Sequence, residues 1–322
     1  MKKKILLGLI ILCTLLSGCG KSQSIANSFS DSGDDSAQAD SPLAFADGPA
    51  SNVAVVAKDA SNTEGSDKLN SEAALLVDAT DGVVLFQKNA HKKEYPASTT
   101  KILTSLITLK YGDTDSSRTI GNEVVINEDN VVMCDYRIGD VIPYDVIIHG
   151  AMMKSGNDAA AALALFAADN LDDFADMMNE EAKLLGATES HFVNPHGLYD
   201  DNHYSTAYDM YLIFNEAIKY DKFVDVIACK QYNGSFIRKT SYGEYTINAE
   251  YVNTNRYVTG DRVAPSYIKV IGGKAGYTEV AKRSYVMLAE ANGHQYIFVT
   301  MRCDDYEQLY SDLDYLMSLI PE

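Results

Sequence analysis

Two residues of the sequence could form a nucleophile and its base. Ser98 and Lys101 are the ends of a Ser-Thr-Thr-Lys run, and side chains three residues apart on a helix share one face. A serine hydroxyl attacks a carbonyl carbon well only when a neighbouring base takes its proton. A lysine can be that base where burial or nearby positive charge lowers its pKa. The pair therefore predicts acyl transfer through a covalent serine intermediate.

Two later segments carry side chains that suit the same chemistry. Ser155 and Asn157 belong to a Ser-Gly-Asn run at the expected break between two helices, where a hydroxyl and an amide can project into a cleft. Lys274 begins a Lys-Ala-Gly-Tyr run near the end of an expected strand and could supply positive charge. Each motif alone is common in proteins of many kinds. Together they predict one site, provided that the fold brings them to the same place.

Helices are expected in the middle of the chain, where apolar residues recur at a helical period. The first helix follows Pro96 and buries a stripe that includes Leu103 and Leu106, with Gly112 at its C-terminal cap. Thr206 is expected to begin a later helix. Further helices are predicted over residues 144–153, 157–168, 174–185, 207–220 and 306–320.

Strands are expected at both ends of the chain. A hairpin is predicted over residues 73–77 and 83–86, and later strands over residues 267–271, 284–291 and 295–301. Asn292-Gly293 is typical of a type I′ hairpin turn. The order predicts a single α+β domain, in which an antiparallel sheet formed by both chain ends packs against a helical cluster between them.

The N-terminal residues predict export and lipid attachment. Lysines at positions 2–4 and an apolar run over residues 5–16 form a signal peptide. The run ends in Leu-Ser-Gly-Cys, which resembles a lipoprotein lipobox, so Cys19 is expected to carry the lipid. We expect a signal peptide at 1–19, a flexible tether at 20–70, a folded domain at 71–322 and a location on the outer face of a bacterial cell membrane. A plain secretory signal or an uncleaved helix is the alternative.

The composition excludes several kinds of ligand. A formal net charge of −18 argues against nucleic acid, because phosphate binding needs clustered Lys and Arg. Cys134, Cys229 and Cys303 would remain after the signal is removed, with no spacing typical of zinc. Buried free thiols are therefore expected.

The three motifs and their surroundings resemble D-alanyl-D-alanine carboxypeptidases, the low-molecular-weight penicillin-binding proteins. Their order is similar to the S-x-x-K, S-x-N and K-T-G set of penicillin-binding proteins and serine β-lactamases. The segments at 96–101, 154–160, 192–198 and 203–210 look like those of the carboxypeptidases, and the resemblance covers about residues 73–320. It implies a penicillin-binding/β-lactamase-like transpeptidase fold and a serine DD-peptidase domain at 71–322.

The resemblance also implies a role for each matched residue. Ser98 would attack the carbonyl between the terminal D-alanines of a peptidoglycan stem peptide, with Lys101 as general base, and water would then hydrolyse the acyl-enzyme. Ser155 would relay a proton to the leaving amine, and Asn157 would orient Lys101 and the substrate. Lys274 would supply positive charge. β-Lactam antibiotics would acylate the serine, and no metal or cofactor is required.

The strand after Lys274 is implied to bind substrate through Ala275, Gly276 and Tyr277. Backbone N–H groups of Ser98 and Tyr277 would form the oxyanion hole. The histidines of the other matched segments, His196 and His203, are expected to be buried, hydrogen-bonded and structural.

Ala275 departs from the family pattern, which has Thr or Ser at the middle position of this motif. The missing hydroxyl helps to hold the substrate's terminal carboxylate, and a hydrogen bond to a charged group is worth about 1.5 to 3 kcal/mol. Lys274, Ser155 or Arg302 could hold the carboxylate instead. We therefore expect a slow or specialised peptidase.

Two alternatives stay open at this point. A serine β-lactamase shares the Ser and Lys chemistry but must deacylate quickly, usually with a positioned glutamate. A catalytically silent wall-binding lipoprotein would keep the fold and lose activity through Ala275. Many such carboxypeptidases also carry a β-rich domain and a C-terminal anchor, and the N-terminal lipid is expected to replace that anchor here.

Overall fold

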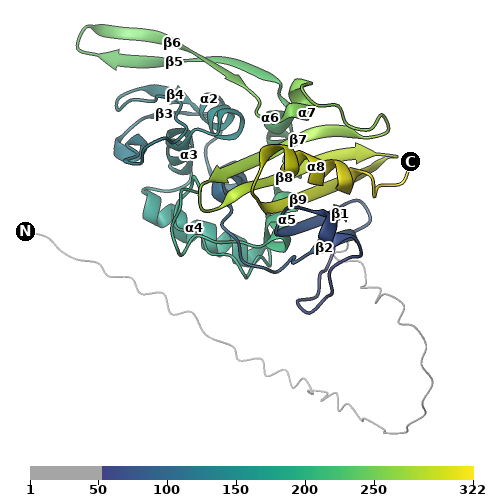
Figure 1. Ribbon diagram of the computed structural model, residues 1–322. Helices are drawn as coiled ribbons and strands as arrows, with labels where there is room; N and C mark the ends of the chain where they lie inside the picture. Colours follow the sequence, from purple (N-terminus) through teal and green to yellow (C-terminus); the bar gives the residue numbers. More distant parts are fainter. Residues whose placement is uncertain (1–52) are drawn as a thin grey trace, which may run out of the picture. The chain divides into compact units, whose positions relative to one another are not determined.

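A computed structural model of the protein describes residues 53–322, and its centre is a five-stranded antiparallel sheet (Figure 1). The strand order is β2-β1-β9-β8-β7. Strands from the two ends of the chain thus lie side by side, as the sequence predicts. The strands are β1 (Ala73–Asp78), β2 (Val83–Lys88), β7 (Lys269–Thr278), β8 (Lys282–Ala291) and β9 (His294–Cys303).

Strand β1 is buried on both faces, which explains its continuous run of apolar residues. Leu75 and Val77 belong to the larger core, which includes most of the helical residues, whereas Leu76 packs into a smaller core under the last helix. Leu75 pairs with Val299 of β9, near the opposite end of the chain. The N-terminal hairpin is therefore held mainly by the C-terminal strands.

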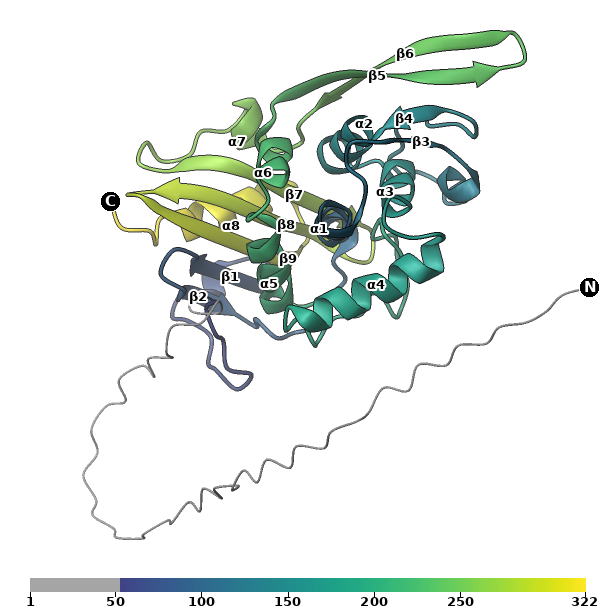
Figure 2. The ribbon, with the colours of Figure 1, turned by 180° about the vertical axis from the view of Figure 1, so that it is seen from behind.

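Helices cover both faces of this sheet. α8 lies on one face (Figure 1), and α1, α5 and α6 lie on the other (Figure 2). The helices are α1 (Lys101–Tyr111), α2 (Tyr144–His149), α3 (Asn157–Ala164), α4 (Leu171–Leu184), α5 (Ala207–Ala217), α6 (Asp221–Ala228), α7 (Arg256–Thr259) and α8 (Tyr306–Met317). Thr206 caps α5 by accepting a hydrogen bond from the Asp209 N–H at 3.0 Å, as expected.

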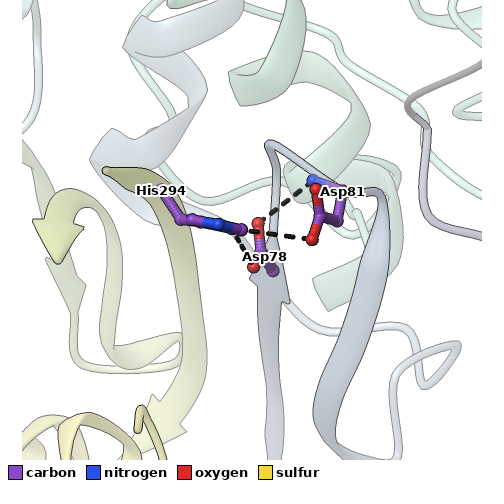
Figure 3. A group of neighbouring side chains, drawn as sticks. All are labelled: Asp78, Asp81 and His294. Carbon is purple, nitrogen blue, oxygen red and sulfur yellow. Dashed lines mark hydrogen bonds and ion pairs between the residues drawn. The ribbon is translucent and has the colours of Figure 1, made fainter. Parts of the chain in front are cut away.

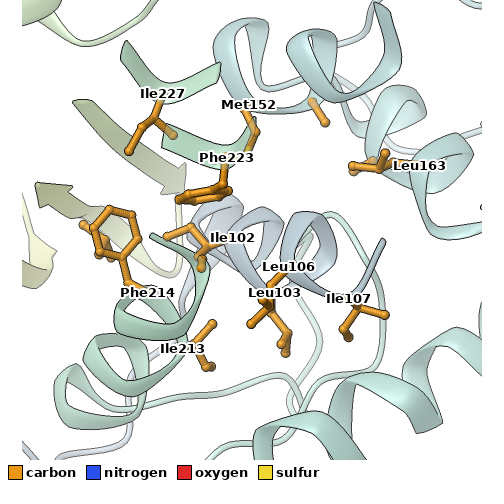
Figure 4. Close-up of a cluster of buried hydrophobic side chains, with 14 of the residues drawn as sticks. Ile102, Leu103, Leu106, Ile107, Met152, Leu163, Ile213, Phe214, Phe223 and Ile227 are labelled. Atoms are coloured by element: carbon orange, nitrogen blue, oxygen red, sulfur yellow. The ribbon is translucent and has the colours of Figure 1, made fainter. Parts of the chain in front are cut away.

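Helix α1 lies in the middle of the larger core (Figure 4). Its residues Ile102 and Leu106 are fully buried, and side chains of other helices, such as Leu163 and Phe223, lie around it. Gly112 ends the helix, and its N–H donates to the Thr108 carbonyl at 3.0 Å. Because packing fixes α1 on all sides, the residues at its N-terminal end are held in place.

The helix predicted over residues 144–153 is two pieces. α2 ends at His149, and Gly150–Lys154 form a π-helical turn. Such turns widen the helix and often occur at functional sites. This turn leads directly into Ser155, whose φ of 66° places it in the left-handed region.

The strand predicted over residues 267–271 is also longer than expected. β7 runs to Thr278 and so includes the whole run from Lys274 to Tyr277, which the sequence placed only at the end of the strand. The hairpin after it fits the prediction: Asn292 and Gly293 have φ values of 53° and 82°, and a type I′ turn requires positive φ at both positions.

A second sheet, in the order β3-β4-β5-β6, was not predicted. Its strands are β3 (Ser117–Thr119), β4 (Val141–Pro143), β5 (Gln231–Thr240) and β6 (Gly243–Val252). The long β5–β6 hairpin buries few side chains, but β6 does alternate apolar residues at 245, 247, 249 and 251 with polar ones, a strand pattern that the sequence prediction overlooked.

The packed region begins before residue 71, where the sequence placed its start. Ala54 is buried, and its N–H donates to the Tyr211 hydroxyl at 2.9 Å; Leu69 is also buried. Residues 53–70 are therefore part of the folded domain. The predicted signal peptide, Cys19 and the tether over 20–52 lie outside the described residues. Within residues 53–322, no helix is both long and apolar enough to cross a lipid bilayer.

The three cysteines predicted as free thiols are free in the described chain, but only Cys303 is fully buried; Cys134 and Cys229 are half-buried.

Candidate active site

The three motifs meet in one cleft of about 670 Å³. This is the spatial arrangement on which the predicted chemistry depends. The lining residues from the motifs are Ser98, Ser155, Asn157, Lys274, Ala275, Gly276 and Tyr277.

Ser98 lies in a tight turn just before α1. Residues Ala97–Thr100 form a single 3-10 turn, and Ala97 has a φ of 49°, which is rare for a residue with a Cβ. Such strain persists only where the surroundings enforce it, and it is concentrated at functional sites. Gly197 is one enforcing neighbour, since a Cβ added there would lie 1.8 Å from the Ala97 carbonyl oxygen. The 192–198 segment therefore holds the turn that carries Ser98.

Lys101 is fully buried and has three polar contacts at its Nζ atom. The Ser98 Oγ lies at 2.9 Å, the Asn157 Oδ1 at 2.8 Å and the His196 carbonyl oxygen at 2.7 Å. Burial lowers the pKa of Lys101 well below its usual value, and the charge of Lys274 lowers it further. A neutral amine in this position can accept the Ser98 proton.

Lys274 and Ser155 form a second polar pair in the cleft. The Lys274 Nζ donates to the Ser155 Oγ at 2.9 Å and to the Ala275 carbonyl oxygen at 2.7 Å. The Lys274 side chain is buried, which lowers its pKa to about 7. Its amine can therefore exchange a proton with Ser155 near neutral pH, and Ser155 is placed to pass that proton on.

The two histidines of the matched segments are buried and hydrogen-bonded, as predicted. His203 Nδ1 accepts from the Val193 N–H at 3.2 Å, so its other nitrogen, Nε2, carries the proton and donates to the Thr100 Oγ1 at 2.8 Å. Burial lowers the pKa of His203 to about 4 and that of His196 to about 3, so both rings are neutral at pH 7. Sequence reasoning missed one contribution, the His196 main-chain carbonyl that contacts Lys101.

Gly276 lets strand β7 approach the nucleophile turn. A Cβ at this position would meet the Pro96 oxygen at 2.9 Å and the Ser98 nitrogen at 3.0 Å. β7 is the last strand of its sheet and pairs only with β8 among the described strands. Its other edge can therefore pair with an extended peptide that lies beside Ser98.

Residues outside the motifs complete the cleft. Those that sequence reasoning missed include Arg283 of β8, Tyr306 of α8 and the loop at residues 128–132. No motif marks them, because their placement depends on how distant segments pack. Arg302, suggested from sequence as a carboxylate ligand, is misplaced for that role: it lines a different hollow with Glu94, 3.6 Å away.

One group among the described residues has side chains that could surround a metal ion: Asp78, Asp81 and His294 (Figure 3). It lies where β1 ends and β9 begins, outside the cleft. His294 Nδ1 contacts Asp78 Oδ2 at 2.8 Å, and Asp78 Oδ1 accepts the N–H groups of Thr80 and Asp81. These contacts stabilise the β1–β2 turn, which accounts for why the three side chains lie together. That the reaction needs no metal or cofactor stays a prediction.

Comparisons with known proteins agree with this geometry. Residues 59–305 match the family model described as D-alanyl-D-alanine carboxypeptidase. The chain is 31% identical over 225 residues to the D-alanyl-D-alanine carboxypeptidase DacF of Bacillus subtilis, covering 69% of this chain and 54% of that protein. It is 35% identical over 165 residues to DacA of Escherichia coli, covering 48% and 41%. The chain thus spans about half the length of these curated relatives.

A solved structure is similar over almost its whole length. A mutant of the Streptomyces K15 DD-transpeptidase superposes with a TM-score of 0.71 at 25% identity, covering 78% of this chain and 97% of that one. The predicted penicillin-binding/β-lactamase-like fold is therefore confirmed.

Proposed function

The chain belongs to the D-alanyl-D-alanine carboxypeptidase family of serine peptidases, and from this membership we propose that it hydrolyses the terminal D-Ala–D-Ala bond of peptidoglycan stem peptides. One observation carries the proposal. The buried Lys101 amine lies 2.9 Å from the Ser98 hydroxyl, in the same cleft as the Ser155–Lys274 pair.

In the first step, the Ser98 Oγ bonds to the carbonyl carbon of the penultimate D-alanine, and its proton moves to Lys101. Desolvation lowers the pKa of Lys101 and so favours its neutral form beforehand, and Asn157 Oδ1 and the His196 carbonyl stabilise the ammonium that forms. The N-terminal end of α1 favours the negative charge that develops at Ser98.

In the second step, the C–N bond breaks and the terminal D-alanine leaves as an amine. Ser155 donates a proton to that nitrogen and is reprotonated through Lys274, which lies 2.9 Å away. Water then attacks the acyl carbonyl, and its proton passes through Ser155 to Lys274, which lost a proton in the previous step. The ester bond to Ser98 breaks as Lys101 returns the first proton to Ser98 Oγ. β-Lactams would stop after the first half of this sequence, because their opened ring leaves a stable acyl group on Ser98.

The substrate peptide would lie along the free edge of β7, where main-chain hydrogen bonds can hold it in an extended form. The close approach of Gly276 to the Ser98 nitrogen supports an oxyanion hole at this point, formed by the N–H groups of Ser98 and Tyr277.

We also propose that the domain works outside the cytoplasm on a lipid attached to Cys19. The support is the sequence alone: the lysines at 2–4, the apolar run over 5–16 and the lipobox-like end. The proposed order is a signal peptide at 1–19, a tether that follows it and the peptidase domain. Globomycin treatment of producing cells, followed by mass analysis, would test the lipid.

Intact mass after incubation with benzylpenicillin tests the enzymatic proposal. We expect one adduct per chain, mapped to the peptide that contains Ser98 and lost in Ser98→Ala, together with release of D-alanine from a pentapeptide by the wild type. Rapid multiple turnover of nitrocefin would favour a β-lactamase. An absence of both labelling and D-alanine release would favour a silent wall-binding protein and overturn the proposal.

A further inference from the structure

Arg283 occupies the cleft on the strand next to Ala275. It stands near the start of β8, and its side chain lines the same cavity as Ser98 and Lys274. Arginine is the side chain best suited to bind a carboxylate, because its planar guanidinium presents two parallel N–H donors.

The strand register places Arg283 on the same face of the sheet as position 275. Tyr277 lies directly opposite Arg283, and Ala275 lies opposite Tyr285. Since side chains two residues apart on a strand point to one face, all four share that face. Arg283 is thus the diagonal neighbour of Ala275, a separation that a long side chain can span.

Two tyrosines hold the Arg283 guanidinium in position. Its central carbon lies 4.5 Å from the ring centroid of Tyr277 and 5.0 Å from that of Tyr306. Both rings line the cleft. A cation fixed between two aromatic rings loses little rotamer freedom when it binds a ligand, so this arrangement favours recognition.

The guanidinium also has unused hydrogen-bonding capacity. Its Nε is buried and has no hydrogen-bond partner among the described residues. Other arginines, in contrast, are paired with carboxylates: Arg238 with Asp140 and Arg262 with Asp314. A buried donor without a partner is costly, and a ligand oxygen would satisfy it.

The other cations are less suited to this task. The Lys274 amine faces inward, toward Ser155 Oγ and the Ala275 carbonyl. Arg302 lies in a different hollow and pairs with Glu94.

Two acids lie near Arg283. Glu279 is an exposed residue of the cleft rim, and Asp305 accepts the N–H groups of Glu307 and Gln308 at the start of α8.

We propose that Arg283 binds the terminal carboxylate of the substrate and thereby replaces the hydroxyl that Ala275 lacks. This inference rests on the proposed peptidase function and names the group that recognises the free C-terminus. The same subsite would receive the carboxylate of a β-lactam.

The test compares ligands with and without that carboxylate. The purified full-length chain and Arg283→Gln would be acylated by benzylpenicillin and by its methyl ester, with the second-order rate constants followed by intact mass. Loss of a charged hydrogen-bonded pair should slow acylation by benzylpenicillin about tenfold to a hundredfold. Acylation by the ester should be unchanged. Arg283→Lys keeps the charge but not the two parallel N–H donors. Its rate constant with benzylpenicillin should therefore lie between those of the wild type and Arg283→Gln.

Arg302→Gln is the matched control, an arginine on the neighbouring strand that lies outside the cleft. It should leave both rate constants unchanged. Thermal unfolding of each variant would show whether the domain is intact. Equal losses for both ligands, or no loss for benzylpenicillin, would overturn the role of Arg283 while the wild type remains acylated. A wild type that neither ligand acylates would instead overturn the peptidase function.

A second substitution tests the replacement directly. Ala275→Thr restores a hydroxyl on the same face of β7. It should raise the benzylpenicillin rate constant more in the Arg283→Gln background than in the wild type, because only the first lacks a carboxylate ligand. Equal gains in both backgrounds would mean that the two positions act independently, which contradicts the proposal.

Discussion

Removing the Asn157 side chain should slow acylation by a calculable amount. Asn157 is buried, and its Oδ1 lies 2.8 Å from the Lys101 Nζ. In the transition state Lys101 gains a proton, so this oxygen accepts a hydrogen bond from a developing ammonium. Such a bond is worth about 1.5 to 3 kcal/mol, which corresponds to a factor of about 10 to 100 in rate. We expect Asn157→Ala to lose acylation rate by that factor.

The pH dependence gives the same prediction an independent readout. Because Oδ1 stabilises the protonated amine, its loss should lower the pKa of Lys101 further. The acylation rate follows the neutral amine, so its rising limb should move to lower pH in Asn157→Ala. Rate constants for benzylpenicillin acylation, measured by quenched-flow mass analysis from pH 5 to 9, would show both effects.

Asn253→Ala is the matched control. Asn253 is also buried, and its amide donates to the Ile227 carbonyl at 3.0 Å and to the Cys229 carbonyl at 2.9 Å, outside the cleft. It should lose stability without a change in the acylation pH profile. The reasoning about Asn157 fails if its removal leaves the rate unchanged, or if Asn253→Ala slows acylation as strongly.

Three further predictions follow from the cleft and its supports. Lys274→Gln removes a positive charge that lowers the pKa of Lys101. That pKa should therefore rise and the acylation profile should move to higher pH, whereas Lys269→Gln, on the exposed end of the same strand, should leave the profile in place. Gly276→Ala should slow acylation with little change in melting temperature, because its Cβ would press on the Pro96 oxygen and the Ser98 nitrogen; an unchanged rate would show that β7 can shift freely. Asp312→Ala should lower the free energy of unfolding by about 2 to 4 kcal/mol, since it leaves the N–H and hydroxyl of Ser71 without their acceptor. Urea unfolding at pH 7 would check this value, and an unchanged free energy of unfolding would contradict the buried contact.

The local part of the site could be predicted from sequence. Ser98 and Lys101 are three residues apart, so a single helical turn fixes their relation. The convergence of Asn157 and Lys274 was predictable only because the motif order resembles that of a known family. The strained φ values of Ala97 and Ser155 had no sequence signal, since nothing in their residue types indicates a left-handed backbone.

Arg283 could not be found from sequence because its position depends on strand register. A slip of one residue between β7 and β8 would turn its side chain to the opposite face. For the same reason Arg302, which lies on the closing strand β9, was given the wrong role. The β5–β6 hairpin was missed although apolar and polar residues alternate along β6. Few of its side chains are buried, and main-chain pairing holds the two strands together.

The pairing of β1 with β9 constrains how the protein can be made. The ribosome completes β1 long before it reaches β9, so the apolar strand must wait without this partner during most of synthesis. Folding that depends on such distant contacts is slow and exposes nascent strands to wrong partners. A chain that ended at Asn292 would lack both β9 and α8, and we expect it to aggregate or be degraded even though Ser98, Asn157 and Lys274 are all present in it.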